Sequence, residues 1–248
     1  KIKYMDSKFK MPTETVELPS KGLLYPEDSP LTKGEIEMKY MTAKEEDILT
    51  NANYINNGTV IDKLLNSLII TEGVKYEELL VGDKNALMVA ARILSYGKDY
   101  ETLYLNKKYT VDLSKIKNKE IDYNVLKDCK NNIEFELPQT KNKVTFKFLN
   151  HQDEKNIENE MKGLEKMNKN SSTKVTTRLK HTITSINGLS ESKDIREFVD
   201  KFLLASDARA LRNYITSISP DVELKFYPDG VSEGVDLPIG IGFFWPDF

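Results

Sequence analysis

The sequence predicts an α+β fold made of two tandem related repeats, each with short strands, then a bundle-like helical segment, then a terminal β-hairpin. Segments in which apolar and polar residues alternate come before segments with helical spacing of apolar residues. Similar segments also recur in the same order in both halves of the chain. The 248 residues, of which 39% are hydrophobic and 30% charged, suffice for one large domain or two small ones.

The repeat rests on matched segments that keep their order along the chain. Those of the first half are Glu17-Leu18-Pro19, residues 36–41, Glu45-Glu46, Lys63-Leu64, residues 82–87 and residues 111–113. They match Glu136-Leu137-Pro138, residues 144–149, Asp153-Glu154, Arg178-Leu179, residues 206–211 and residues 235–237. One match could arise by chance, but the shared order favours a tandem duplication. The predicted units are a first α+β repeat at 1–113, a polar linker at 114–132, and a second α+β repeat with an aromatic C-terminal tail at 133–248.

The first repeat is predicted to contain a strand at residues 36–41, where apolar and polar residues alternate. Thr42 stands three residues before Glu45, which is the spacing of a capping box, so a helix follows the strand. A second helix is marked by apolar residues at helical spacing: Val60, Leu64, Leu65, Leu68 and Ile69. A third helix is predicted to start at Asp83 and to stop at Gly97, and residues 101–113 are extended.

The second repeat is predicted in the same way. A strand at residues 144–149 leads through Asn150 and Asp153 into a helix, and the polar stretch 162–174 is predicted to be a loop. Two more helices follow, marked by apolar residues from Ile195 to Leu203 and from Leu211 to Ile218, with Asp207 as the cap of the second. Residues 224–237 read as extended chain around a turn at 228–230.

Composition limits the classes of function. Lys and Arg number 36 against 39 Asp and Glu, which gives a net charge of −3 and argues against a generally cationic nucleic-acid binder. A third hypothesis, nucleic-acid binding through the Lys-rich residues 115–130, is weakened by the acidic residues among them. No apolar run is long enough to span a membrane, and the first residues lack the apolar core of a signal peptide. We therefore expect a soluble protein of the cytoplasm.

The residues that carry common chemistry are scarce. Cys129 is the single cysteine, so neither an intrachain disulfide nor a cysteine-based zinc site is predicted, and a free surface thiol is expected. The two histidines, His151 and His181, are expected to be a solvated residue and a helix-face residue rather than bases. No glycine-rich phosphate loop is present. We predict no catalytic residue, no metal and no cofactor.

The acidic pairs leave one enzymatic alternative open. Glu45-Glu46 and Asp153-Glu154 could act as paired carboxylates in a hydrolase, which would require a raised pKa in a cleft. Each pair also falls in the first turn of a predicted helix, where the helix dipole favours negative charge. The structural interpretation is preferred, and a cell-wall hydrolase remains the alternative.

Two segments are candidates for partner binding. The first is a Pro-flanked loop at residues 18–26, with Pro19, Lys21, Gly22, Leu24 and Tyr25 as its candidate residues. It could fill the core of its own domain or dock a partner. The second is the tail, with Phe243, Phe244 and Trp245. Buried aromatic residues dominate both cores and interfaces, so the tail could cover its own domain or anchor in another subunit.

The same segments carry a resemblance to a known family. Residues 12–26 read PTETVELPSKGLLYP and residues 38–50 read MKYMTAKEEDILT. Together with residues 81–86, 90–92, 95–97, 237–239 and 243–246, they resemble the baseplate hub proteins of T-even-like contractile-tailed bacteriophages, the group of the hub subunit and the hub assembly catalyst.

The resemblance implies a non-enzymatic late protein of viral tail assembly. Its implied partners are other baseplate hub proteins, with self-association as an option and no nucleic acid. Its implied location is the host cytoplasm during infection, or the tail baseplate of the virion if it is a retained hub component. Many relatives carry cysteine pairs of zinc-ribbon type, but residues 103–109 and 226–230 here contain no cysteine. The resemblance therefore implies hairpins held by Tyr and Phe packing rather than by zinc.

Overall fold

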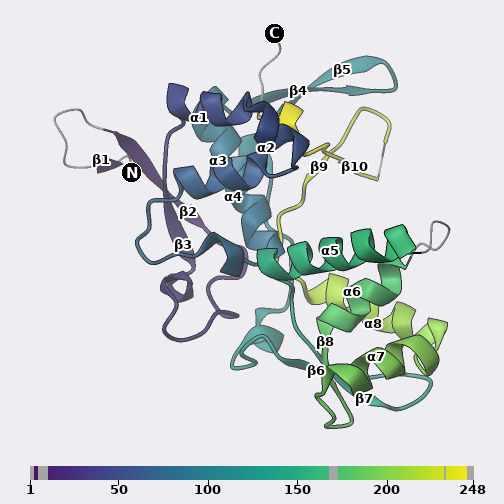
Figure 1. Cartoon of the computed structure of the whole chain (residues 1–248). Helices are drawn as coiled ribbons and strands as arrows, with labels where there is room; N and C mark the ends of the chain where they lie inside the picture. The colour runs from purple at the N-terminus through teal and green to yellow at the C-terminus, as the bar shows by residue number, and fades with distance from the viewer. Residues whose placement is uncertain (1–2, 5–10, 168–172, 232, 245–248) are drawn as a thin grey trace.

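The computed structural model describes residues 3–4, 11–167, 173–231 and 233–244, and it has the predicted α+β fold (Figure 1). The helices are α1 (Ala43–Leu49), α2 (Ala52–Asn56), α3 (Val60–Leu68), α4 (Val81–Tyr96), α5 (His151–Met167), α6 (Lys174–Thr182), α7 (Ser192–Lys201) and α8 (Ala205–Ile218). The strands are β1 (Lys3–Tyr4), β2 (Pro12–Glu17), β3 (Glu35–Lys39), β4 (Asp99–Tyr104), β5 (Lys107–Asp112), β6 (Ile133–Glu136), β7 (Lys143–Phe146), β8 (Ile183–Ile186), β9 (Lys225–Phe226) and β10 (Val235–Asp236).

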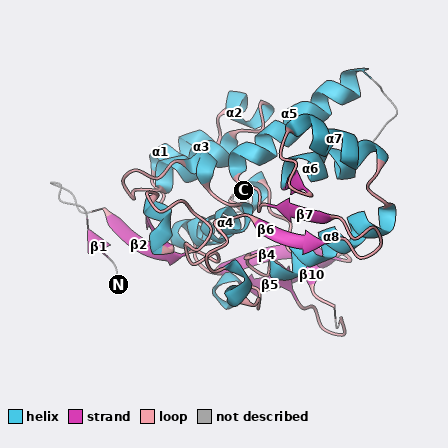
Figure 2. Cartoon of the chain, turned by 90° about the horizontal axis from the view of Figure 1, so that it is seen from below, coloured by secondary structure: helices cyan, strands magenta, loops and turns pink. Residues whose placement is uncertain are grey.

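All four sheets are small and antiparallel: β1-β2-β3, β4-β5, β6-β7-β8 and β9-β10. Seen from below, α1, α3, α5 and α7 lie along one side of the molecule, and β4 to β7 lie toward the other (Figure 2). The buried apolar side chains of both halves form one continuous hydrophobic core. Burial of this core is the main force that stabilises the fold.

In the first half, β3 passes directly into α1 through the predicted capping box. The Thr42 amide and hydroxyl donate to Glu45 Oε2 at 2.9 and 2.6 Å, and Lys39 Nζ lies 2.7 Å from Glu45 Oε1. After α3 the chain returns to the strand, where Met38 forms an antiparallel bridge with Ile69. The strand ends at Lys39, two residues earlier than the alternation predicts.

The second half repeats this arrangement. Asn150 and Asp153 exchange backbone-to-side-chain hydrogen bonds of 3.2 and 2.8 Å, and Lys147 Nζ lies 2.7 Å from Asp153 Oδ1. Phe146 pairs with Ile183 after α6, as Met38 pairs with Ile69 after α3. These contacts support the tandem duplication, which stays a prediction.

One prediction in the second half needs correction. The polar stretch 162–174 is not all loop, because α5 continues to Met167 and α6 begins at Lys174. Its Lys and Glu residues are good helix formers, and Lys162 pairs with Glu158 one turn earlier at 2.6 Å. Composition alone therefore underestimated this helix.

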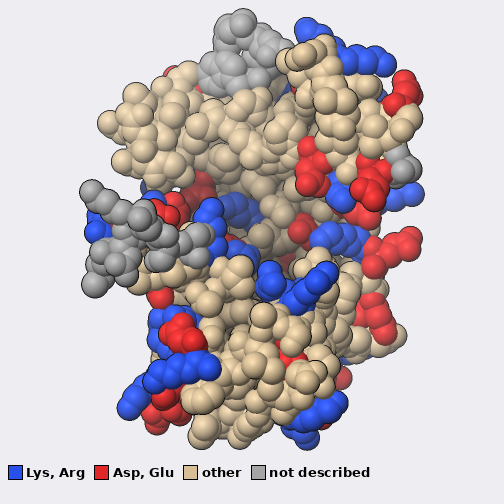
Figure 3. Space-filling model, turned by 90° about the vertical axis from the view of Figure 1, so that its right-hand side faces the viewer, with Lys and Arg blue, Asp and Glu red and all other residues tan. Residues whose placement is uncertain are grey.

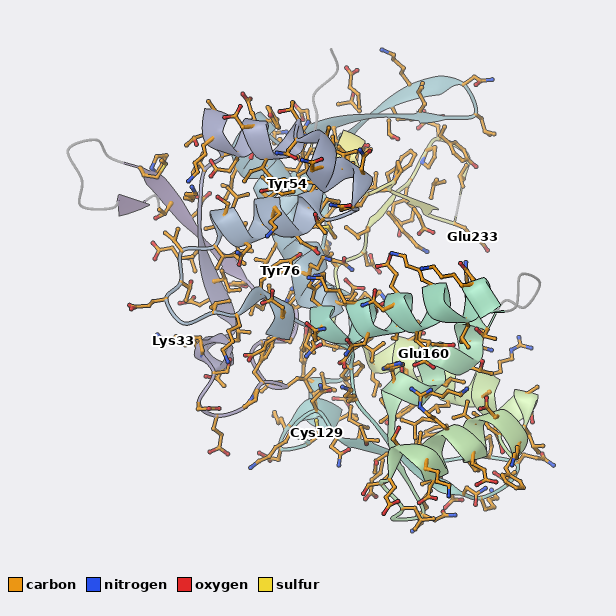
Figure 4. All side chains as sticks on the ribbon, viewed as in Figure 1. Lys33, Tyr54, Tyr76, Cys129, Glu160 and Glu233 are labelled. Atoms are coloured by element: carbon orange, nitrogen blue, oxygen red, sulfur yellow. The ribbon has the colours of Figure 1, made fainter. Side chains whose placement is uncertain are left out.

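The two halves are joined by backbone hydrogen bonds. His151 N donates to Leu79 O at 2.8 Å, and Val81 N donates to Leu149 O at 3.1 Å. The predicted linker is also ordered: Lys119 N donates to the Asp221 carbonyl at 2.8 Å. Cys129, expected at the surface, is half-buried, and its thiol donates to the Leu126 carbonyl at 3.2 Å (Figure 4).

The chain after α8 returns to the first half. Phe226 in β9 contacts the rings of Tyr104 and Tyr109 in the β4–β5 hairpin at 6.2 and 5.7 Å, and Phe243 lies 5.0 Å from the ring of Tyr100. The hairpins thus pack through aromatic rings at the positions where relatives were expected to carry cysteines. The second repeat was predicted to be residues 133–248, and part of it packs on residues of the first repeat.

Candidate partner-binding site

The Pro-flanked loop lies mostly in the interior. Pro19, Gly22, Leu24 and Tyr25 are buried, and only Lys21 among the candidate residues is exposed. Lys21 has a positive φ of 52° and holds its ammonium 3.7 Å from the centre of the Tyr123 ring. Of the two alternatives for this loop, the described conformation is that of a loop that fills its own core, and partner contact through these residues stays a prediction.

Asp83 holds this loop in place. Its carboxylate accepts hydrogen bonds from Ser20 N at 2.9 Å, Ser20 Oγ at 2.6 Å and Tyr25 Oη at 2.6 Å, and it has no solvent exposure. Burial raises the pKa of Asp83, against the effect of these hydrogen bonds. A helix was predicted to start at Asp83, but α4 begins two residues earlier, and the Asp83 side chain anchors the loop at residues 18–26.

Asp207 has the same role in the second half. Its carboxylate accepts from Gln139 N at 2.8 Å, Thr140 N at 3.1 Å and Thr140 Oγ1 at 2.7 Å. Burial opposes its ionisation, but the hydrogen bonds from Gln139 and Thr140 outweigh burial and lower the pKa of Asp207. Asp207 was predicted to cap its helix, but it lies inside the first turn of α8, which begins at Ala205. The matched positions of the two aspartates were the only sequence signal for this role.

The described part of the aromatic tail is buried. Phe243 and Phe244 are 1% and 0% exposed, and their rings meet edge to face at 5.3 Å. Trp245 lies outside the described residues. In this conformation the rings of Phe243 and Phe244 cover their own domain. Partner docking through the tail stays a prediction.

The acidic pairs are committed to structural contacts. Glu45 is fully buried; burial opposes its ionisation, but hydrogen bonds from Lys39, Thr42 and Ser67 outweigh burial and lower its pKa to about 2. Glu46 accepts from Tyr96 Oη at 3.2 Å. The Glu154 carboxylate accepts hydrogen bonds from Nη1 and Nη2 of the Arg178 guanidinium group. A general acid must hold its proton near neutral pH, which a carboxyl group with a pKa of about 2 does not do.

Acid is expected to weaken the fold through Glu45. The pKa of this carboxyl group is lower in the folded chain than the ordinary glutamate value of about 4.3, so its stabilisation is complete above that value. Stabilisation on the order of 2 kcal/mol is lost as the pH falls through about 4 toward about 2. Urea unfolding of the protein and of E45Q between these pH values measures it. The variant should show a flatter dependence on pH, and an equal slope would contradict the prediction.

His151 is buried at the junction of the halves, where a solvated side chain was expected. Its Nε2 lies 3.0 Å from Asp62 Oδ2, and its Nδ1 lies 3.2 Å from Lys84 Nζ. An ammonium group only donates, so Nδ1 accepts and Nε2–H donates to Asp62. Tyr76, near the start of α5 (Figure 4), also donates to Asp62 at 3.0 Å. Burial opposes the ionisation of Asp62, but these partners hold its pKa well below the usual range.

His181 lies on a helix face, as expected, and joins three helices. Its Nε2 is 2.9 Å from Oε2 of Glu160 on α5, and Arg196 on α7 binds the same carboxylate at 2.7 and 2.8 Å (Figure 4). Hydrogen bonds from Arg196 lower the pKa of Glu160 to about 2. Within the described ranges, no cluster of His, Cys, Asp and Glu is arranged to hold a metal ion, and no helix is long and apolar enough to cross a membrane.

A basic groove of about 570 Å³ lies where the halves meet, and we name it the junction groove. It is lined by the first turn of α4, one face each of α6 and α8, residues 147–149 and 219–221, and Lys119. Its cations are Lys119, Lys147, Lys174, Arg178 and Arg212, and among the described residues that line it, Asp221 is the only carboxylate. Figure 3 shows a hollow at mid-height on one face of the molecule, with Lys and Arg side chains around it and some Asp and Glu side chains at its edge. No stretch of the sequence predicts this groove, because its walls come from segments far apart in the chain.

Comparison with known proteins identifies a family. No curated protein and no solved structure matches the chain. The model of the family described as T4 bacteriophage base plate protein matches residues 11–223. This span includes the loop at residues 18–26, both anchoring aspartates and every cation of the junction groove. Because the match covers most of the chain, the protein belongs to the T4 bacteriophage base plate protein family.

Proposed function

We propose that this chain is a non-enzymatic assembly protein that docks hub subunits during construction of the phage tail baseplate. The family match over residues 11–223 carries the proposal, because membership gives the chain a structural or assembly role in a phage baseplate. Docking of hub proteins is the finer step, and it agrees with the resemblance of residues 12–26 and 38–50 to baseplate hub proteins.

The contacts of the acidic pairs support a role without catalysis. Glu45 and Asp153 each bind a lysine and the backbone at the start of a helix. Glu154 is held by Arg178 in a two-pronged ion pair. Such contacts stabilise local structure, and they give these carboxylates a structural reason to be where they are.

Loss of the protein is expected to block baseplate assembly. In cells infected with a phage that lacks this gene, purified particles should contain few or no complete baseplates, and expression of the chain from a plasmid should restore them. The E46Q/E154Q double variant should restore assembly equally well, because amides replace carboxylates that have no chemical role. Normal baseplates without the chain would refute the proposal. Failure of the amide variant, together with reduced cell-wall turnover, would favour the hydrolase instead.

The place of action is tested with the same material. Mass spectrometry of purified tails and of the infected-cell lysate compares the amount of the chain per baseplate. A transient assembly factor of the host cytoplasm should be present in the lysate and absent from tails. A retained hub component should be present in both.

A further inference from the structure

We propose that the junction groove is the docking site for an acidic segment of a partner protein, in which Asp or Glu residues flank an apolar anchor. This inference rests on the proposed function, and it names the surface and the chemistry of the partner. The surface differs from the loop at residues 18–26 and from the tail, whose described side chains are largely buried.

The first observation is the charge of the groove. Two of its five cations are neutralised within the chain: Lys147 by Asp153 at 2.7 Å, and Arg178 by Glu154. The other three, Lys119, Lys174 and Arg212, have no carboxylate within 4 Å among the residues that the structure describes. A cleft lined by one sign of charge concentrates the opposite charge.

The remaining carboxylate does little to balance these cations. Asp221 Oδ1 accepts hydrogen bonds from Asn85 Nδ2 at 3.0 Å and from the Val222 amide at 2.8 Å. On α6, Lys174 lies one turn before Arg178, and of these two cations only Arg178 is paired with a carboxylate of the described residues, that of Glu154. The Lys174 ammonium is therefore left for an acidic ligand.

The second observation is the apolar surface between the cations. Val175 is 46% exposed although it lines the groove, and Ile215, another residue of the lining, is half-buried. Phe148 and Pro220 complete an apolar base that is already buried. A bare inorganic anion would leave this surface unused, whereas an apolar side chain flanked by carboxylates would cover it and meet the cations at the rim.

The third observation is that the wall of the groove is fixed before any ligand binds. A Cβ atom at Gly82 would lie 2.0 Å from the Pro220 carbonyl oxygen, so only glycine lets the first turn of α4 approach the chain after α8. Lys119 N also donates to the Asp221 carbonyl at 2.8 Å, and Glu223 N donates to the Lys117 carbonyl at the same distance. A preformed groove loses less conformational entropy on binding.

A protein ligand fits these features better than a nucleic acid. Single strands bind along extended basic tracks with exposed aromatic rings for base stacking, but the aromatic residue of this groove, Phe148, is only 7% exposed. The chain as a whole has a net charge of −3, which opposes the approach of a long polyanion. A volume of about 570 Å³ suits a few residues of a peptide chain.

Charge reversal in the groove tests the proposal. The probes are overlapping peptides that cover the other baseplate proteins of the same phage, measured by fluorescence anisotropy against the full chain. The bound peptides should carry Asp or Glu beside Leu, Ile or Phe. The K174E/R212E double variant should bind them at least about tenfold more weakly. Versions of these peptides with Lys in place of Glu should prefer the double variant.

The matched control is K33E/K44E, which reverses two exposed lysines outside the groove. It should bind the acidic peptides like the unmodified chain, and both double variants should unfold at the same urea concentration as that chain. Three outcomes would overturn the proposal: no acidic peptide binds, groove reversal leaves the affinity unchanged, or a single-stranded oligonucleotide binds as tightly as the peptides at physiological salt.

Assembly in infected cells separates this inference from the proposed function. If the gene is required for baseplates and K174E/R212E restores them fully, the groove is not the docking site and the assembly role stands. If baseplates form normally without the gene, the assembly role itself is refuted. Loss of assembly with K174E/R212E but not with K33E/K44E supports both.

Discussion

Replacement of Asp83 by alanine is expected to lower the free energy of unfolding by about 3–5 kcal/mol, because it removes a fully buried acceptor of three hydrogen bonds. Ser20 and Tyr25 would keep their buried donors without a partner, which costs more than the bonds themselves contribute. Urea denaturation followed by circular dichroism measures the change. The loop at residues 18–26 should also become more accessible to proteases.

Asp99→Ala is the matched control, since this carboxylate is 67% exposed and, among the described residues, its ion pair is with the neighbouring Lys98 at 3.3 Å. It should change the stability by no more than about 0.5 kcal/mol. Asp207→Ala should cost nearly as much as Asp83→Ala if the halves use their aspartates alike. A cost below about 1 kcal/mol for Asp83→Ala would contradict the anchoring role.

Replacement of Phe244 by alanine is expected to cost about 3–5 kcal/mol as well, through the cavity it leaves in a fully buried site. For a chain of this size the melting temperature should fall by roughly 10 °C. Thermal unfolding followed by circular dichroism measures the shift. The loss of packing should also affect the first half of the chain, because Phe243, the edge-to-face neighbour of Phe244, packs on Tyr100.

Tyr227→Ala is the control for this experiment, since the side chain is 62% exposed in the same segment, and its effect should stay within about 0.5 kcal/mol. An equally small effect of Phe244→Ala would mean that the tail does not contribute to the core. The burial of Phe243 and Phe244 also changes the interpretation of a tail deletion. Removal of residues 243–248 would destabilise the fold, so a loss of partner binding after that deletion would not by itself identify a docking residue.

The sequence predicts the fold well where the signal is local. The alternation at residues 36–41 gives β3, and the Thr42-to-Glu45 spacing gives the start of α1, because both depend on residues close in the chain. The roles of Asp83 and Asp207 are not predictable in this way. Ser20 and Asp83 are 63 residues apart, and a hydrogen bond between such segments leaves no periodic pattern.

The site is less predictable than the fold for two physical reasons. Apolar residues in a turn-rich loop or in a tail give the same sequence pattern whether they fill their own core or dock a partner. Only the packing of the folded chain distinguishes the two roles. The junction groove combines residues from both halves, so no stretch of sequence contains it. Its one local sign is Lys174 and Arg178 on a single helix face, which is common on solvent-exposed helices.

The return of the last described segment to the β4–β5 hairpin also sets the order of events during synthesis. Tyr100, Tyr104 and Tyr109 leave the ribosome long before Phe226 and Phe243, which cover them in the finished fold. At about 5–20 residues per second, the hairpin waits on the order of ten seconds with its aromatic face open to water. We therefore expect nascent chains that stop before residue 226 to be prone to aggregation.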